Sequence, residues 1–519
     1  MELIFITLIS SLFLSLEFLP YFYALTITPK GFVFLGVTHY AYDYFYYLSH
    51  MAQGASHLFF STNLHSGEMQ VYTYIGWVYV LWGKLFSIFG IFQTVGYQLA
   101  SFFMMLLFLF ILYKFLQSVF LDSWTKRVGA FFLFLFSNAL ITFQNGHLTF
   151  FDTWSNIGTP FIRLEMVPHH LLTQTLLVAS LFLVFSRRSK LIAFSCQLLA
   201  ISFLLSTLQP LQWALMGGSI GIISFLLKPS LKSLLPGILW ILAGLPSVLT
   251  FRALFQTQPY VNTMTWEAAQ QQVYSLIDFF TYNGIVAILG SIGLPFILRK
   301  HTKPLTLLLF YSFLSITLFF SPLPQYFSLL NIRFLSSLPT LLFAVSTVEL
   351  FSFQLSAFSR KIKINSSLLV IVYWILGIGS IAFLAPPLFF QMKQRLDYDV
   401  NNAYFYVSKG AYDALVYAPK VSTIDDVFLV QWPFSAPFTG LSGRREYDSN
   451  FLATINIKVK EPKARAFFEG KMREEEMRSF LKENRITRII TYPWTFQTPL
   501  SFMKELYKTE ILAIYSVTI

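Results

Sequence analysis

Long apolar segments recur along the whole chain, and they restrict its fold more than any other feature. Only 12% of the 519 residues are charged, about half the share found in soluble domains. A helix of about 20 apolar residues can cross the hydrocarbon core of a bilayer. The sequence therefore predicts a polytopic membrane protein built mainly of α-helices. The apolar segments lie at 3–26, 70–92, 94–113, 128–143, 167–185, 191–208, 211–228, 233–250, 282–298, 304–321, 334–351 and 366–389.

Cysteine content and charge exclude several other classes. The single cysteine, Cys196, lies in an apolar segment, which excludes a disulfide framework and a thiolate metal site. The formal net charge of +12 could indicate nucleic acid, but Lys and Arg in a membrane protein usually report its orientation. Neither a Walker motif nor a GxGxxG motif is present. We therefore expect no nucleic acid and no nucleotide as a partner.

Basic residues gather in clusters, and two apolar segments separate each cluster from the next. The positive-inside rule places all of these clusters on the cytoplasmic face. The loops 144–166, 251–281 and 322–333 then lie on the opposite face, and the last crossing, 366–389, puts the tail outside as well. The clusters are Lys114/Lys126/Arg127, Arg187/Arg188/Lys190, Lys228/Lys232, Arg299/Lys300/Lys303 and Arg360/Lys361/Lys363.

The segment 70–92 decides on which side the first loop lies. Lys84 sits near its middle, where a charge is costly in a spanning helix and cheap in an interfacial one. We therefore predict an interfacial or re-entrant helix here and about 11 spans in total. This topology places the loop 27–93, which contains Asp43, on the outer face.

The tail from about residue 390 differs in composition from the rest. It holds about half of the 37 Lys and Arg and more than half of the 25 Asp and Glu. Strand-like stretches (VFLVQW, RIITYP, LAIYSVT) accompany one charged helical stretch, KARAFFEGKMREEEMRSFLKENR. We predict a transmembrane module over 1–389 and a small extracytoplasmic α/β domain over 390–519. Within this domain, we predict that the GLSGRREYD stretch forms a turn with solvated charges.

Ionisable side chains are concentrated in two outer loops. One contains HYAYDYFYY and NLHSGEMQ, with Asp43 and Glu68. The other reads HLTFFDTWSNIGTPFIRLEMVPHH, with Asp152, Glu165 and His169. Ionisable groups close to the hydrocarbon are expensive, so they suggest function. A carboxylate can accept a proton from an attacking hydroxyl, and Arg or Lys can neutralise a leaving phosphate. Such a set suits transfer of a group from a lipid phosphate.

Structural explanations compete with these functional ones. Tyr and Trp belts are ordinary at a membrane interface. Arg333 could hold a donor phosphate or extend to the lipid headgroups. A divalent metal held by Asp43, Asp152, Glu165 and His169 is chemically feasible, but no spacing demands it.

The chain resembles the GT-C glycosyltransferases, which include the protein O-mannosyltransferases and the lipid A aminoarabinose transferases. It is most similar to a group of bacterial GT-C-like membrane proteins. The stretches that carry the resemblance are DYFYYLSHMAQGA, TNLHSGEMQ, TPFIRLEMVPHH, LLSTLQPLQW, FTGLSGRREYDSNF, KARAFFEGKM and FLKENRITRIITYP. The chain lacks the HPP run of the O-mannosyltransferases and the WWDYG-type motif of oligosaccharyltransferases, so the acceptor class does not carry over.

The resemblance implies a GT-C membrane fold and a site on the outer face. GT-C enzymes take sugar from a polyprenyl-phosphate carrier, and an acid of the first outer loop acts on the acceptor. By this resemblance Asp43 is the first catalytic residue, followed by Asp152 and Glu165. Lys84 matches a lysine that some relatives use near the lipid phosphate. The residues expected to bind substrate are Lys84, Arg163, Arg333, Tyr42, Tyr46, Glu68 and His169.

These considerations predict a glycosyltransferase of the bacterial inner membrane that moves a sugar from a polyprenyl-phosphate carrier to an extracytoplasmic glycan, lipid or protein. Membrane lipids and the acceptor are its expected partners, and a divalent metal ion is the one cofactor left open. The alternative is a transporter or flippase of lipid-linked envelope precursors. A non-catalytic scaffold is a third reading, which leaves the acidic loops unexplained.

Overall fold

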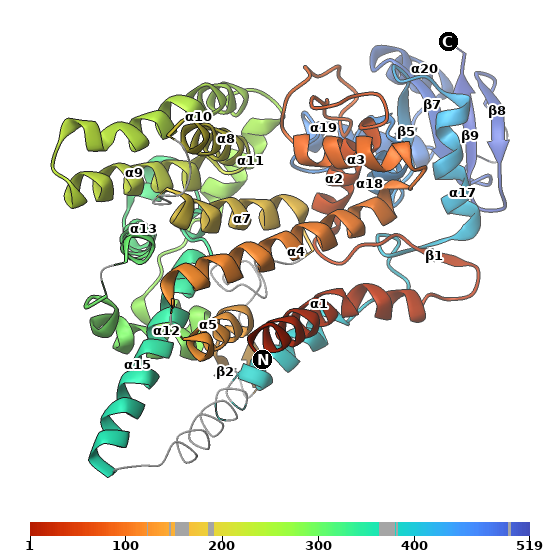
Figure 1. The fold of residues 1–519 in the computed structure, drawn as a ribbon. Helices are drawn as coiled ribbons and strands as arrows, with labels where there is room; N and C mark the ends of the chain where they lie inside the picture. Colours follow the sequence, from red (N-terminus) through yellow and green to blue (C-terminus); the bar gives the residue numbers. More distant parts are fainter. Residues whose placement is uncertain are drawn as a thin grey trace. The chain divides into compact units, whose positions relative to one another are not determined.

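The computed structural model describes residues 1–519 except 122, 145–146, 151–165, 185–190, 301, 363–378, 380–381, 383, 497–499 and 519. The chain forms two compact units (Figure 1). Unit 1 comprises Met1–Phe18, Phe102–Ala253 and Met264–Arg395, and unit 2 comprises Leu19–Ser101, Leu254–Thr263 and Leu396–Ile519. The functional division predicted at 389/390 stays a prediction.

Helices dominate the described part of the chain. The α-helices are α1 (Glu2–Thr26), α2 (Ala41–Gln53), α3 (Trp77–Ile88), α4 (Gln93–Val119), α5 (Trp124–Phe136), α7 (Pro168–Leu183), α8 (Leu191–Leu208), α9 (Pro210–Leu227), α10 (Leu235–Leu254), α11 (Tyr260–Ala269), α12 (Leu276–Ile297), α13 (Lys303–Phe320), α14 (Leu323–Tyr326), α15 (Leu338–Ile362), α17 (Lys409–Tyr417), α18 (Ser435–Ser442), α19 (Ile457–Phe468) and α20 (Glu474–Glu483). The 3₁₀ helices are η2 (Leu231–Leu234), η3 (Asn331–Phe334) and η4 (Ala418–Val421). The strands are β1 (Phe32–Phe34), β2 (Ile141–Gln144), β3 (His147–Phe150), β4 (Tyr406–Ser408), β5 (Val427–Val430), β6 (Arg445–Glu446), β7 (Ile486–Thr491), β8 (Met503–Lys508) and β9 (Ala513–Val517).

Seven described helices are long and apolar enough to cross a membrane: α1, α4, α9, α10, α12, α13 and α15. The chain is thus an integral, multi-pass membrane protein, as predicted. The count of about 11 spans stays a prediction. Three of the described helices in these segments, α3, α5 and α7, are shorter than expected of a spanning helix. Helix α5 has 13 residues and ends at Phe136, short of the predicted 143. Helix α3 has 12 residues, which agrees with the prediction that 70–92 does not span.

Small residues let two helices of unit 1 approach closely. A Cβ added at Gly290 or Gly293 of α12 would collide with the backbone of Phe343 or Ser346 in α15. Close backbone approach of this kind stabilises helix pairs in lipid, where no hydrophobic driving force acts between them. Gly284 of α12 has φ +70°, and the Asn138 carbonyl occupies the space of its Cβ, so only glycine fits there.

Unit 2 contains a five-stranded mixed sheet with the order β6-β5-β7-β9-β8. Strands β6, β5 and β7 are parallel, and β9 pairs antiparallel with β7 and β8. The three predicted strands are β5, β7 and β9, which confirms the small α/β region of the tail. The single predicted helical stretch is wrong, because it contains two helices. Gly470, with φ +66°, lies between α19 and α20 and ends the first of them.

The N-terminal part of unit 2 covers one face of this sheet. Phe45 and Leu48 of α2 pack against Gly440 of α18, in one core with Phe428 and Ile490 of the sheet. On the other face, α19 and α20 supply the buried side chains Phe467, Met477, Phe480 and Leu481. Strand β1 pairs antiparallel with β4, which ties the first loop to the tail. The loop that carries Asp43 is therefore held by residues more than 350 positions later in the chain.

Candidate functional site

Asp43 lies in the first turn of α2 and is half-buried. The N-cap residue, Tyr40, makes no side-chain cap hydrogen bond, and the amide groups of the first helical turn carry a partial positive charge. This field favours the ionised carboxylate of Asp43. Burial raises the pKa of Tyr40, and the negative charge of Asp43 raises it further. The position suits a group that accepts a proton.

Stacked aromatic rings support α2 behind Asp43. The rings of Tyr47 and Tyr79 stack at 4.5 Å between centroids, and those of Tyr79 and Tyr97 at 6.0 Å. The Tyr97 hydroxyl lies 2.8 Å from Nε2 of His39. These rings form a packed support, so part of the aromatic belt has a structural role. Tyr46 likewise packs edge-on against His50, with ring centroids 4.6 Å apart.

Two other residues of unit 2 that were predicted to bind substrate, Lys84 and Glu68, contact other groups of the protein. The Lys84 ammonium donates to the carbonyl of Ala55 at 3.0 Å. Glu68 forms an ion pair with Lys460 of α19 at 2.6 Å and accepts from Ser66 at 2.5 Å. Lys460 is almost fully buried, and its hydrogen bond helps lower the pKa of Glu68 against the opposing effect of burial. This pair connects the first loop to the tail.

The remaining predicted residues belong to the other unit. Arg333 lies in η3 and makes an ion pair with Glu267 of α11 at 2.6 Å. His169 is half-buried in the first turn of α7, beside the ring of His170 at 4.3 Å. Asp152, Arg163 and Glu165 lie outside the described residues. The roles assigned to all these residues stay predictions.

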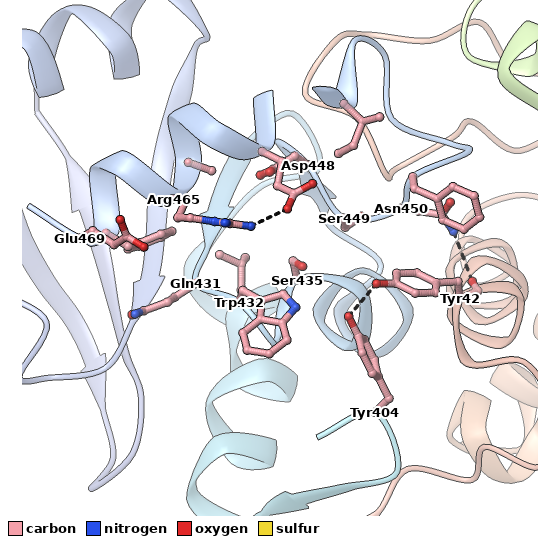
Figure 2. A pocket seen from close by; sticks show the side chains of 16 residues that line it. Tyr42, Tyr404, Gln431, Trp432, Ser435, Asp448, Ser449, Asn450, Arg465 and Glu469 are labelled. Carbon is pink, nitrogen blue, oxygen red and sulfur yellow. Dashed lines mark hydrogen bonds and ion pairs between the residues drawn. The ribbon is translucent and has the colours of Figure 1, made fainter. Parts of the chain in front are cut away.

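Unit 2 contains a cavity of about 490 Å³ that the sequence did not indicate. Tyr42 lies on its wall, one residue before Asp43, and its hydroxyl is 2.9 Å from the hydroxyl of Tyr404. In Figure 2 the guanidinium of Arg465 lies along the cavity, where it donates to the carboxylate of Glu461 at 2.8 Å. The lining residues are Tyr42, Tyr404, Val430, Gln431, Trp432, Ser435, Asp448, Ser449, Asn450, Phe451, Ile457, Glu461, Ala464, Arg465, Phe468 and Glu469.

The reading of GLSGRREYD as a turn with solvated charges is wrong. Arg445 and Glu446 form strand β6 and are 5% and 0% exposed. Burial, together with the neighbouring Asp448, raises the pKa of Glu446 well above its ordinary range. Burial also raises the pKa of Asp448 to about 7. The sequence carries no apolar periodicity here that would signal burial, so composition alone could not reveal these two acids.

The raised pKa of Asp448 predicts a pH-dependent stability. The folded chain holds a proton on Asp448 up to about pH 7, whereas the unfolded chain loses it near the ordinary value of 3.8. The contribution of this group to the free energy of unfolding therefore falls as the pH rises from about 4 to about 7. We expect Asp448→Asn to remove this part of the slope when melting temperature in detergent is measured from pH 4 to 8. The exposed Asp413, changed to Asn, is the control and should leave the slope intact. Equal slopes for wild type and Asp448→Asn would contradict the assignment.

A metal site finds no support among the described residues, where no group of three or more His, Cys, Asp or Glu side chains could hold an ion. Two of the four ligands considered from the sequence, Asp152 and Glu165, lie outside those residues. No step proposed below depends on a metal.

No protein-family model and no curated protein matches this chain. The oligosaccharyltransferase AglB from Archaeoglobus fulgidus, in complex with an inhibitory peptide and a dolichol-phosphate, matches 94% of this chain and 69% of its own, with 12% identity and a TM-score of 0.55. The same enzyme in complex with zinc and sulfate matches 94% and 67%, with 12% identity and a TM-score of 0.52. ArnT from Cupriavidus metallidurans, bound to undecaprenyl phosphate, matches 98% and 97%, with 11% identity and a TM-score of 0.49.

The likeness to AglB confirms the predicted GT-C fold class. It extends over nearly the whole chain and therefore includes both the membrane helices and the tail. A fold alone does not define a reaction, because one fold can host several functions.

Proposed function

We propose that this protein is a membrane glycosyltransferase that moves a sugar from a polyprenyl-phosphate carrier to an extracytoplasmic acceptor. The observation that carries the proposal is the GT-C fold shared with AglB, an oligosaccharyltransferase whose structure contains a dolichol-phosphate. This likeness to a transferase favours the enzyme over the flippase. We propose in addition that the reaction takes place at the outer face of the bacterial inner membrane and that the tail lies on the same side.

Asp43 is the residue proposed to activate the acceptor. The acceptor hydroxyl attacks the anomeric carbon of the donor sugar, and Asp43 takes its proton. The bond between the anomeric carbon and the phosphate oxygen breaks, and polyprenyl phosphate leaves with the electron pair. Asp43 lies in the first turn of α2, where the partial positive charge of the helix start stabilises a negative charge. Asp152 and Glu165 are the alternatives for the same role.

Cationic side chains are proposed to neutralise the leaving phosphate. Lys84, Arg163 and Arg333 are the predicted set, and His169 is a further residue predicted to bind substrate. The ion pair of Arg333 with Glu267 implies that Arg333 must exchange or share this partner when it contacts phosphate.

Release of polyprenyl phosphate tests the proposal. The purified wild-type protein is incubated with a panel of polyprenyl-phosphate sugars, and a cell-envelope extract supplies the acceptor. We expect acceptor-dependent release of polyprenyl phosphate with at least one donor. Movement of intact lipid-linked sugar across liposomes, without release from any donor of the panel, would instead support the flippase.

A further inference from the structure

The cavity of unit 2 has the side chains that recognise sugars. Trp432 is 72% exposed and Phe451 is 38% exposed, although both line a concave surface. An exposed tryptophan is costly to leave in water and is well suited to cover the apolar C–H face of a sugar ring. Tyr404 and Tyr42 add two further aromatic walls joined by their hydroxyl groups.

Polar side chains around these rings can both donate and accept hydrogen bonds, as a polyhydroxyl ligand requires. Asp448 and Asn450 line one side, and the Asn450 Oδ1 is oriented by the backbone amides of Leu452 and Ala453. On the other side, Thr491 and Thr495 donate to Oε1 of Gln431 and so orient its amide. Preoriented groups bind with less loss of side-chain entropy than mobile ones.

Charge restricts the ligand further. Three carboxylic acids, Asp448, Glu461 and Glu469, line the cavity, against one base, Arg465. Arg465 already contacts Glu461 at 2.8 Å. Glu469 in turn pairs with Lys471 at 2.6 Å, and Asp448 carries a proton up to about pH 7. Among the described lining residues, a ligand carboxylate or phosphate therefore finds no cation that lacks an acidic partner. The cavity volume of about 490 Å³ lies in the range of small-molecule pockets.

The position of the cavity connects it with Asp43. Tyr42, which lines it, and Asp43 are successive residues in the first turn of α2. We infer that the cavity binds the acceptor, and that the acceptor is a saccharide without acidic groups, stacked on Trp432 and hydrogen-bonded to Asp448 and Asn450. The assignment of this saccharide as the acceptor rests on the proposed function, whereas its binding does not.

Direct binding to the full-length protein in detergent tests the inference. The probes are glucose and N-acetylglucosamine oligomers, with glucuronate-containing oligomers of equal length as the acidic comparison. We expect the neutral oligomers to bind at least about tenfold more tightly than the acidic ones, and Trp432→Ala to weaken their binding by about tenfold or more. Trp494→Ala is the matched control, because Trp494 is 63% exposed in the same tail and does not line this cavity.

Three results would overturn the inference: no binding of the neutral oligomers, equal binding by Trp432→Ala, or preference for the acidic oligomers. Transfer kinetics separate this failure from failure of the proposed function. If polyprenyl phosphate is released but Trp432→Ala leaves the KM for the acceptor unchanged, the function stands and the cavity assignment fails. If the oligomers bind through Trp432 but no donor is turned over, the binding site stands and the transferase proposal fails.

Discussion

Asp43→Asn is expected to lower the rate of polyprenyl phosphate release by about 100-fold or more, because general base catalysis contributes roughly 10²- to 10⁴-fold. The substitution keeps the size of the side chain and its place in the first turn of α2 but removes the group that accepts the proton. Release should be measured at saturating donor and acceptor, so that the loss is seen in kcat and not only in KM.

The matched control for this variant is Asp413→Asn. Asp413 lies in the same unit, in α17, and pairs with Lys409 on the surface, where its side chain is 39% exposed. We expect this variant to keep wild-type activity. Both proteins should also have the melting behaviour of wild type, which shows that the loss is chemical. An Asp43→Asn protein with full activity would move the catalytic role to Asp152 or Glu165.

Arg395→Leu is expected to destabilise the protein by about 3–5 kcal/mol, because it leaves a buried carboxylate without its ion-pair partner. Arg395 and Glu17 lie in unit 1, 3.0 Å apart, and their side chains are only 6% and 0% exposed. The variant should melt at a clearly lower temperature in detergent than wild type.

A second substitution separates the effect of the lost ion pair on stability from the effect of the changed side-chain packing. In the double variant Glu17→Leu/Arg395→Leu no charge stays buried at this place, so most of the melting temperature should return. The surface pair Lys409–Asp413 is the comparison, with side chains 61% and 39% exposed. Lys409→Met should change the stability by no more than about 1 kcal/mol. A double variant less stable than Arg395→Leu would contradict the ion-pair explanation.

The membrane fold could be predicted because its signal is local. Each spanning helix needs its own run of apolar residues, and the strands β5, β7 and β9 each carry their own β-branched pattern. The break between α19 and α20 was missed because one glycine, Gly470, is a weak signal within a strongly helical composition. The short strands β1 and β4 have three residues each and no pattern to identify them.

The candidate site could be predicted only in part, because its contacts join residues far apart in sequence. Asp43 stood out as an acid in an aromatic stretch, and that signal is local. The pairing of Glu68 with Lys460, and the wall that Tyr42 shares with Tyr404, depend on how the tail folds back. Nothing near Asp448 in the sequence indicates that it is half-buried beside a cavity.

The pairing of β1 with β4 also determines when during synthesis the protein can become active. A ribosome that has made residues 19–101 has produced Asp43, but the strand, the helix α18 and the cavity wall that hold its loop come only after residue 396. Until then, the apolar side of α2 has no partner from the tail, and such exposed surfaces attract chaperones and proteases. We therefore expect chains that stop before residue 396 to be less stable than the full chain, because this core stays incomplete. The core around α2 is complete only after the tail has been made and folded.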